Sequence, residues 1–261
     1  MAESESERAR QGIRACRTAH DELAALVARL DSAGLRAQSG CSEWTVAGVL
    51  SHLGSAAEIG LGTLTTGKAD RDGMPAIWDR WNAMSPEEQA AEFVISDARL
   101  VQALEAVDDE DLRNRKLDVG FLPQPISIGF QTSMRLSEVG LHRWDIDIAF
   151  NPGAEVRPYT VPYILDVLPT FAGFFSKPIG QVGLVGVTTS DPDCSYVLEL
   201  REESATLAEG RALSAPTQAF LPAEALLRLT SGRLAPAHTP PSVTVTGELT
   251  LDDLRRAFPG Y

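Results

Sequence analysis

Residues that build cross-links, membrane spans or phosphate contacts are scarce in this chain. Among 261 residues there are three cysteines, Cys16, Cys41 and Cys194, with no C-x-x-C pair. This argues against both a disulfide framework and a thiolate zinc site, so each cysteine is interpreted as a small buried or surface residue. No apolar run reaches the ~20 residues that span a bilayer.

Basic side chains are also in deficit, with 23 Lys and Arg against 36 Asp and Glu and a net charge of −13. Phosphate groups would be repelled, so we expect no nucleic-acid or membrane partner. The start, "MAESESERARQG", lacks the apolar core of a secretory signal, and a cytoplasmic protein is expected. We expect a monomer or homodimer acting on a small molecule.

The first ~150 residues show helical periodicity. A first helix is predicted over residues 6–32, and Thr45 is placed to cap a second that runs to "TTGKADRDG". "SPEE" predicts a capping box, with Ser85 as N-cap and Glu88 closing it, for a third helix ending near Val107. A fourth covers 127–150 and stops at "NPG". Together they predict an up-down four-helix bundle over residues 1–152.

The pattern changes after residue 152. An amphipathic helix, "VPYILDVLPTFAGFF", precedes the strand-like segments "QVGLVGVTT", "SYVLELR" and "SVTVTG". Short helices are expected at "PAEALLRLTSG" and "TLDDLRRAF". Residues 153–261 are therefore predicted to form a small α/β domain, which makes the whole chain α+β.

The stretch "SEVGLHRWDIDIAF", residues 137–150, carries the chemistry. Its spacing puts Glu138, His142 and Asp145 on one helix face, between leucine and isoleucine. Burying unpaired carboxylates costs several kcal/mol, so a cation or a hydrogen-bond network is expected to compensate them. His52, one of only four histidines, lies beside an apolar stripe and should also point inward.

Facing helices of a bundle can assemble a metal site from such residues. His52, Glu138 and His142 would supply the His₂Glu set of a catalytic zinc site with one open position. Asp145 would accept a histidine N–H, or lie near the open position. The alternative is that Glu138 pairs with Arg135 or Arg143 and that His142 is a satisfied core histidine.

Two segments in order, "SEWTVAGVLSHLGS" (42–55) and "RLSEVGLHRWDIDIAF" (135–150), resemble the mycothiol-dependent maleylpyruvate isomerase family. That family has a DinB-like four-helix N-terminal domain. The tail "ALLRLTSGRLAP…SVTVTGELTLDDLRRAFPG" resembles its small C-terminal α/β domain, which is related to sterol-carrier-like modules. The resemblance implies a divalent metal, usually zinc, on His52, Glu138 and His142, with mycothiol at the open position.

The resemblance also implies a reaction. The metal delivers the thiol as a thiolate, which adds to a cis double bond; rotation and elimination then give the trans product, and other members are S-transferases. An arginine near the site would bind substrate carboxylates, and Arg80 in "IWDRWNAM" is carried over for this role. Arg143 points about 100° away from His142 on an ideal helix and is a poorer choice.

Two other functions stay open at the level of the sequence. In a metal-dependent hydrolase the open position would activate water, with Asp145 or Glu138 as base. In a non-catalytic binding protein, "YILDVLPTFAGFF" would line a pocket for an apolar ligand.

Overall fold

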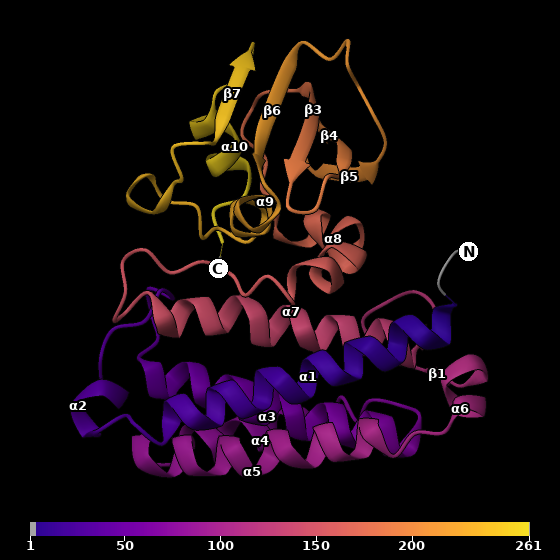
Figure 1. The fold of residues 1–261 in the computed structure, drawn as a ribbon, viewed down its shortest axis with the longest axis vertical. Helices are drawn as coiled ribbons and strands as arrows, with labels where there is room; N and C mark the ends of the chain where they lie inside the picture. Colours follow the sequence, from indigo (N-terminus) through magenta and orange to yellow (C-terminus); the bar gives the residue numbers. More distant parts are fainter. Residues whose placement is uncertain (1–3, 261) are drawn as a thin grey trace. The chain divides into compact units, whose positions relative to one another are not determined.

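The computed structural model describes residues 4–260, which fall into two compact units, one ending at Ala154 and the other starting at Glu155 (Figure 1). The first unit is helical and the second contains a sheet, so the predicted α+β class is confirmed. No helix in the described part of the chain is both long and apolar enough to cross a membrane.

Four long helices build the first unit: α1 (Glu5–Val27), α3 (Val46–Thr66), α5 (Pro86–Glu105) and α7 (Ile128–Asp147). Their starts follow the capping signals in the sequence. The Thr45 hydroxyl accepts from the N–H of Gly48, and Ser85 and Glu88 form the predicted capping box. The first helix is shorter than predicted: α1 ends at Val27, a turn follows, and a separate short helix, α2 (Ser32–Leu35), begins at the last residue of the predicted range.

A helix that the sequence analysis did not predict, α4 (Met74–Asn82), returns the chain between α3 and α5. As a result α3 and α5 run parallel. The Ser96 hydroxyl donates to the carbonyl of Gly54 at 2.9 Å, and Gly60 lies against Leu100 further along both helices.

Helix α7 runs parallel to α1. Ala9 lies against Gly129 near the start of both helices, and Glu22 reaches Arg143 near their ends at 3.8 Å. Helices α3 and α7 run in opposite directions, because Gly40, just before α3, bonds Asp145 near the end of α7. The four long helices therefore run up-down-down-up along the chain and do not alternate strictly.

A buried apolar cluster lies at the end of the bundle where α7 begins, and further buried apolar side chains, such as Leu23, Leu50 and Phe93, lie elsewhere in the bundle. Near that end lie the short helix α6 (Asp109–Asn114) and a two-stranded hairpin, β1 (Lys116–Leu117) with β2 (Ile126–Ser127). The buried cluster there is Ala9, Ile13, Ala57, Leu64, Leu100, Leu104, Leu112, Leu117 and Ile128. The candidate metal ligands on α7, Glu138 and His142, lie toward the opposite end of that helix.

A buried charge network joins three of the long helices between these two regions. Asp97 of α5 is 1% exposed and accepts from Arg135 Nη2 of α7 at 2.7 Å; it also bonds His20 Nδ1 of α1 at 2.8 Å. Burial acts to raise the pKa of Asp97, but the charge of Arg135 and the bond to His20 lower it overall. The network fixes the relative register of the three helices.

The second unit holds a five-stranded sheet in the order β5-β4-β3-β6-β7, in which only β3 and β6 are parallel neighbours. Its strands are β3 (Gly183–Ser190), β4 (Ser195–Leu200), β5 (Ala205–Glu209), β6 (Thr217–Pro222) and β7 (Thr244–Gly247). Its helices are α8 (Val161–Phe175), α9 (Ala223–Thr230), the 3₁₀ turn η1 (Pro236–His238) and α10 (Leu251–Ala257). Strands β5 and β6 were not predicted.

Candidate metal centre

The loop between α2 and α3 sets the start of α3 beside the end of α7. The N–H of Gly40 donates to the carbonyl of Asp145 at 2.8 Å. A Cβ at position 40 would lie only 3.0 Å from Ile148 and 3.1 Å from the Cα of Asp145, so the close approach favours glycine. The two N–H groups of the Gln38 amide are shared among four loop carbonyls, those of Ser39, Cys41, Ser42 and Trp44. A rigid loop therefore closes this end of the bundle.

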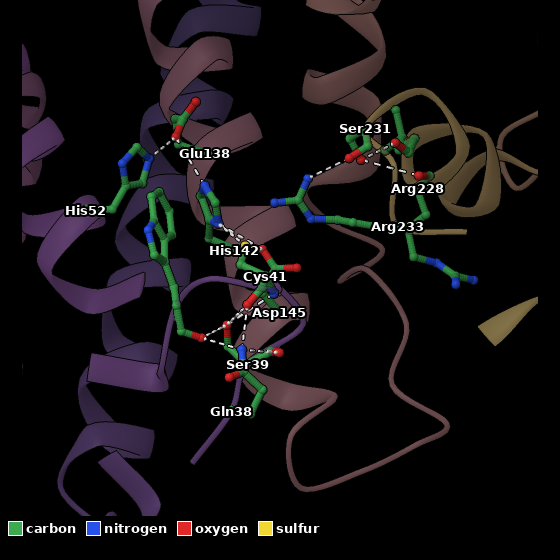
Figure 2. Close-up of polar contacts among 12 residues, drawn as sticks. Gln38, Ser39, Cys41, His52, Glu138, His142, Asp145, Arg228, Ser231 and Arg233 are labelled. Carbon is green, nitrogen blue, oxygen red and sulfur yellow. Dashed lines mark hydrogen bonds and ion pairs between the residues drawn. The ribbon is translucent and has the colours of Figure 1, made fainter. Parts of the chain in front are cut away.

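This arrangement brings His52 of α3 to the two candidate ligands on α7 (Figure 2). His52 Nε2 lies 2.8 Å from Glu138 Oε2, and His142 Nε2 lies 3.6 Å from the same oxygen. One ligand atom from each residue fits within 4.8 Å of the others. The side chains of His52 and Glu138 are 33% and 45% exposed, so the cluster is open to solvent on one side.

The donor set and its spacing fit a tetrahedral divalent metal. Two ligands held ~2.0–2.1 Å from zinc at the tetrahedral angle lie ~3.4 Å apart, and the two N–O separations given above lie on either side of that value. Two imidazoles and one carboxylate are also the ligand types of catalytic zinc sites. The residues present therefore fit the group that the sequence resemblance implies.

Asp145 holds His142 from behind. Its Oδ2 lies 2.8 Å from His142 Nδ1, and the residue is only 1% exposed. A carboxylate there favours the tautomer with the proton on Nδ1, which leaves the Nε2 lone pair directed toward Glu138. In the structure the Asp145 carboxylate therefore lies at the ring nitrogen of His142 that is opposite the one facing Glu138.

Glu138 is held as an anion. Desolvation acts to raise its pKa, but the hydrogen bond with His52 and the nearby imidazoles and Arg135 outweigh it and lower the pKa to about 2. A carboxylate of this kind is ready to act as a ligand without losing a proton.

Two residues beside the cluster were not assigned to a site from the sequence. Cys41 Sγ donates to Asp145 Oδ2 at 3.1 Å and lies 3.8 Å from His142 Nδ1. The Trp44 ring lies 4.9 Å from the ring of His52 and 5.8 Å from that of His142, and forms one wall. Both residues lie within four positions of the Thr45 cap at the start of the His52 helix, and Trp44 also belongs to the segment 42–55 that carries the family resemblance.

Arg80 lies in the unpredicted helix α4, and its guanidinium is paired with Glu58. The Glu58 carboxylate also accepts from the indole N–H of Trp81 at 2.9 Å. Glu58 follows His52 by six residues on α3, about 9 Å along the helix axis. In this structure Arg80 is therefore turned toward Glu58.

The arginines nearest in sequence do not pair with Glu138 through a hydrogen bond. Arg135 bonds Asp97, and Arg143 Nε donates to Asp147 at 2.8 Å on a side of α7 away from the cluster. The alternative in which an arginine neutralises Glu138 directly is thus not what the contacts show, because His52 takes that place.

The family model described as the mycothiol maleylpyruvate isomerase N-terminal domain matches residues 16–147, half of the chain, and includes the whole cluster. The chain belongs to this family. None of the curated proteins matches the chain in sequence.

Two solved structures share the fold across nearly the whole chain. One is a crystal structure of the mycothiol-dependent maleylpyruvate isomerase; the other is a mutant of that enzyme with one histidine replaced by alanine. Each covers 92% of this chain and 94% of its own, with 14% sequence identity and a TM-score of 0.63. At this identity the likeness establishes the fold, and both units of the chain are included in it.

Proposed function

We propose that this protein is an enzyme that uses mycothiol to act on an electrophilic small molecule, either as a cis–trans isomerase of the maleylpyruvate type or as an S-transferase. The observation that carries the proposal is the convergence of His52, Glu138 and His142 on one point, in a chain that belongs to this family. The proposed metal is zinc. When bound, it would supply a Lewis acid that lowers the pKa of a coordinated thiol.

The chain's own side chains then have distinct tasks. His52 and His142 present their Nε2 atoms, and Glu138 offers an anionic oxygen between them. Asp145 is a positioning residue, because it acts through the ring of His142 and keeps the proton on Nδ1. Trp44 covers one flank of both imidazoles and would keep water from that side.

Arg80 is proposed to bind a substrate carboxylate. In the present geometry its guanidinium is occupied by Glu58, so binding requires the arginine to exchange that partner for the substrate. Replacing Arg80 with Gln should then raise KM for a carboxylated substrate and leave KM for an uncharged electrophile unchanged. An equal effect on both would assign Arg80 to structure alone.

The metal is tested by its stoichiometry. Purified protein should carry one zinc per chain, and the Glu138→Ala, His142→Ala double variant should carry none. A matched control is Glu58→Ala, which removes an acidic side chain of the same bundle outside the cluster and should keep the zinc. Equal metal content in all three proteins would contradict the proposed ligand set.

The reaction is tested with mycothiol and two kinds of electrophile. An isomerase converts maleylpyruvate from cis to trans without consuming thiol, whereas an S-transferase accumulates a conjugate with an alkylating substrate. Ester or amide turnover without thiol would instead support a metal-dependent hydrolase. Absence of all three activities in zinc-loaded protein would refute the enzymatic proposal.

A further inference from the structure

A second group of metal-type side chains meets at the other nitrogen of His142. Cys41 Sγ lies 3.8 Å from His142 Nδ1 and 3.1 Å from Asp145 Oδ2, while Nδ1 and Oδ2 are 2.8 Å apart (Figure 2). One ligand atom from each of the three residues lies within 4.8 Å of the others. The proposed function gives the Cys41 thiol no role.

The dimensions of this triangle match those of a cation site that contains sulfur. A thiolate ~2.3 Å and an imidazole ~2.0–2.1 Å from a tetrahedral zinc ion lie ~3.5 Å apart. The observed edges need to change by less than an ångström to surround an ion. Sulfur gives this set a preference for soft, thiophilic cations that the oxygen and nitrogen set of His52, Glu138 and His142 lacks.

The same geometry argues against a nucleophilic relay. In a cysteine–histidine–aspartate relay the thiol and the carboxylate bond opposite nitrogens of the imidazole. Here both Cys41 and Asp145 face Nδ1. They converge on one point, which is the arrangement that a bound ion requires.

We propose that Cys41, His142 and Asp145 form a second metal-binding site, the second seat, for a thiophilic divalent cation. While a cation occupies it, the first seat, formed by His52, Glu138 and His142, cannot hold a cation. A neutral imidazole has one lone pair, so His142 can serve one seat at a time. Binding at the second seat releases the Cys41 thiol proton to solvent and moves the ring proton from Nδ1 to Nε2. His142 is then no longer a ligand for the seat with His52 and Glu138, and a soft cation switches the first site off.

The surroundings support a preformed second seat. The Asp145 residue is 1% exposed, and its backbone is held to the loop by the N–H of Gly40, which donates to its carbonyl at 2.8 Å. The Gln38 amide holds the carbonyl of Cys41 at 2.7 Å. Cys41 itself is partly exposed, which gives a cation a path to the sulfur.

Cobalt(II) distinguishes the two seats, because only a cysteine ligand gives a thiolate-to-cobalt charge-transfer band. His52→Ala removes a ligand of the first seat and leaves the second intact. Cobalt added to this variant should produce the band, and the His52→Ala, Cys41→Ser double variant should lose it entirely. Circular dichroism and thermal melts of both proteins establish that they are folded, and serine keeps the shape of the cysteine.

Two results would overturn the second seat: no charge-transfer band in folded His52→Ala, or a band that survives replacement of Cys41. Competition supplies a further readout, since cadmium added to zinc-loaded wild-type protein should release the zinc, and Cys41→Ser should retain it. The inference is separable from the proposed function. A band in His52→Ala, with no zinc in the wild-type protein, would support the second seat while refuting the catalytic one.

Discussion

Replacing Asp145 tests how much the carboxylate behind His142 contributes to metal binding. It accepts a 2.8 Å hydrogen bond from the His142 ring and is itself only 1% exposed. Loss of such a partner typically weakens metal affinity by ~10–100-fold, or ~1.4–2.7 kcal/mol. Asp145→Asn keeps a carbonyl oxygen that can accept from Nδ1 and should lie near the lower limit. Asp145→Ala removes the acceptor and should lie near the upper one.

The assay is zinc competition with a chromophoric chelator, run on folded protein. Asp147→Asn is the matched control, because it removes a carboxylate two residues further along α7 that bonds Arg143. We expect the zinc affinity of this control to stay within about twofold of wild type, below the loss expected for an outer-shell partner. If Asp145→Ala bound zinc as tightly as Asp147→Asn, the positioning role of Asp145 would be wrong.

Other predictions concern the bundle itself. Asp97→Asn leaves Arg135 buried without its anion, so urea unfolding at pH 7 should show a loss of ~3–5 kcal/mol. Because the pKa of Asp97 is lowered below 3.8, its stabilisation is complete above that pH and is lost as the pH falls through the lowered value; wild type and Asp97→Asn should therefore converge in acid. Gly54→Ala places a methyl group 2.2 Å from the Trp81 ring and should lower the stability of the fold by ~1–3 kcal/mol. Gly62→Ala meets no atom within 4 Å and should raise the stability by ~1 kcal/mol. Thermal melts of the two variants measure both changes. Equal shifts for the two glycine variants would contradict the packing at Trp81.

Local signals in the sequence predicted much of the first unit. Thr45, Ser85 and Ser127 stand where helices begin, because their side chains accept N–H groups that the helix leaves unpaired. The spacing of Glu138 and His142 also fixes their shared face, since residues four apart on a helix are neighbours. These features depend on a few adjacent residues and need no tertiary information.

Features that depend on tertiary contacts could not be predicted from such local signals. Helix α4 is short and begins after Gly73 without a side-chain cap, so the position of Arg80 was set by packing against α3. Cys41 lies in a loop whose path is fixed by backbone contact with α7, far away in sequence. Strand β6 is hydrogen-bonded between β3 and β7, and its partners are visible only once the sheet is assembled.

Because the ligands are far apart along the chain, the stability of the folded bundle depends on the concentration of the cation. His52 and Glu138 are 86 positions apart, so an unfolded chain offers no comparable site and a bound ion favours the folded state alone. An ion present at 100 times its Kd would then add ~2.7 kcal/mol to the free energy of unfolding. A cation held there acts as a reversible cross-link between α3 and α7. Removing it with a chelator would make the same protein unfold sooner in the same solvent.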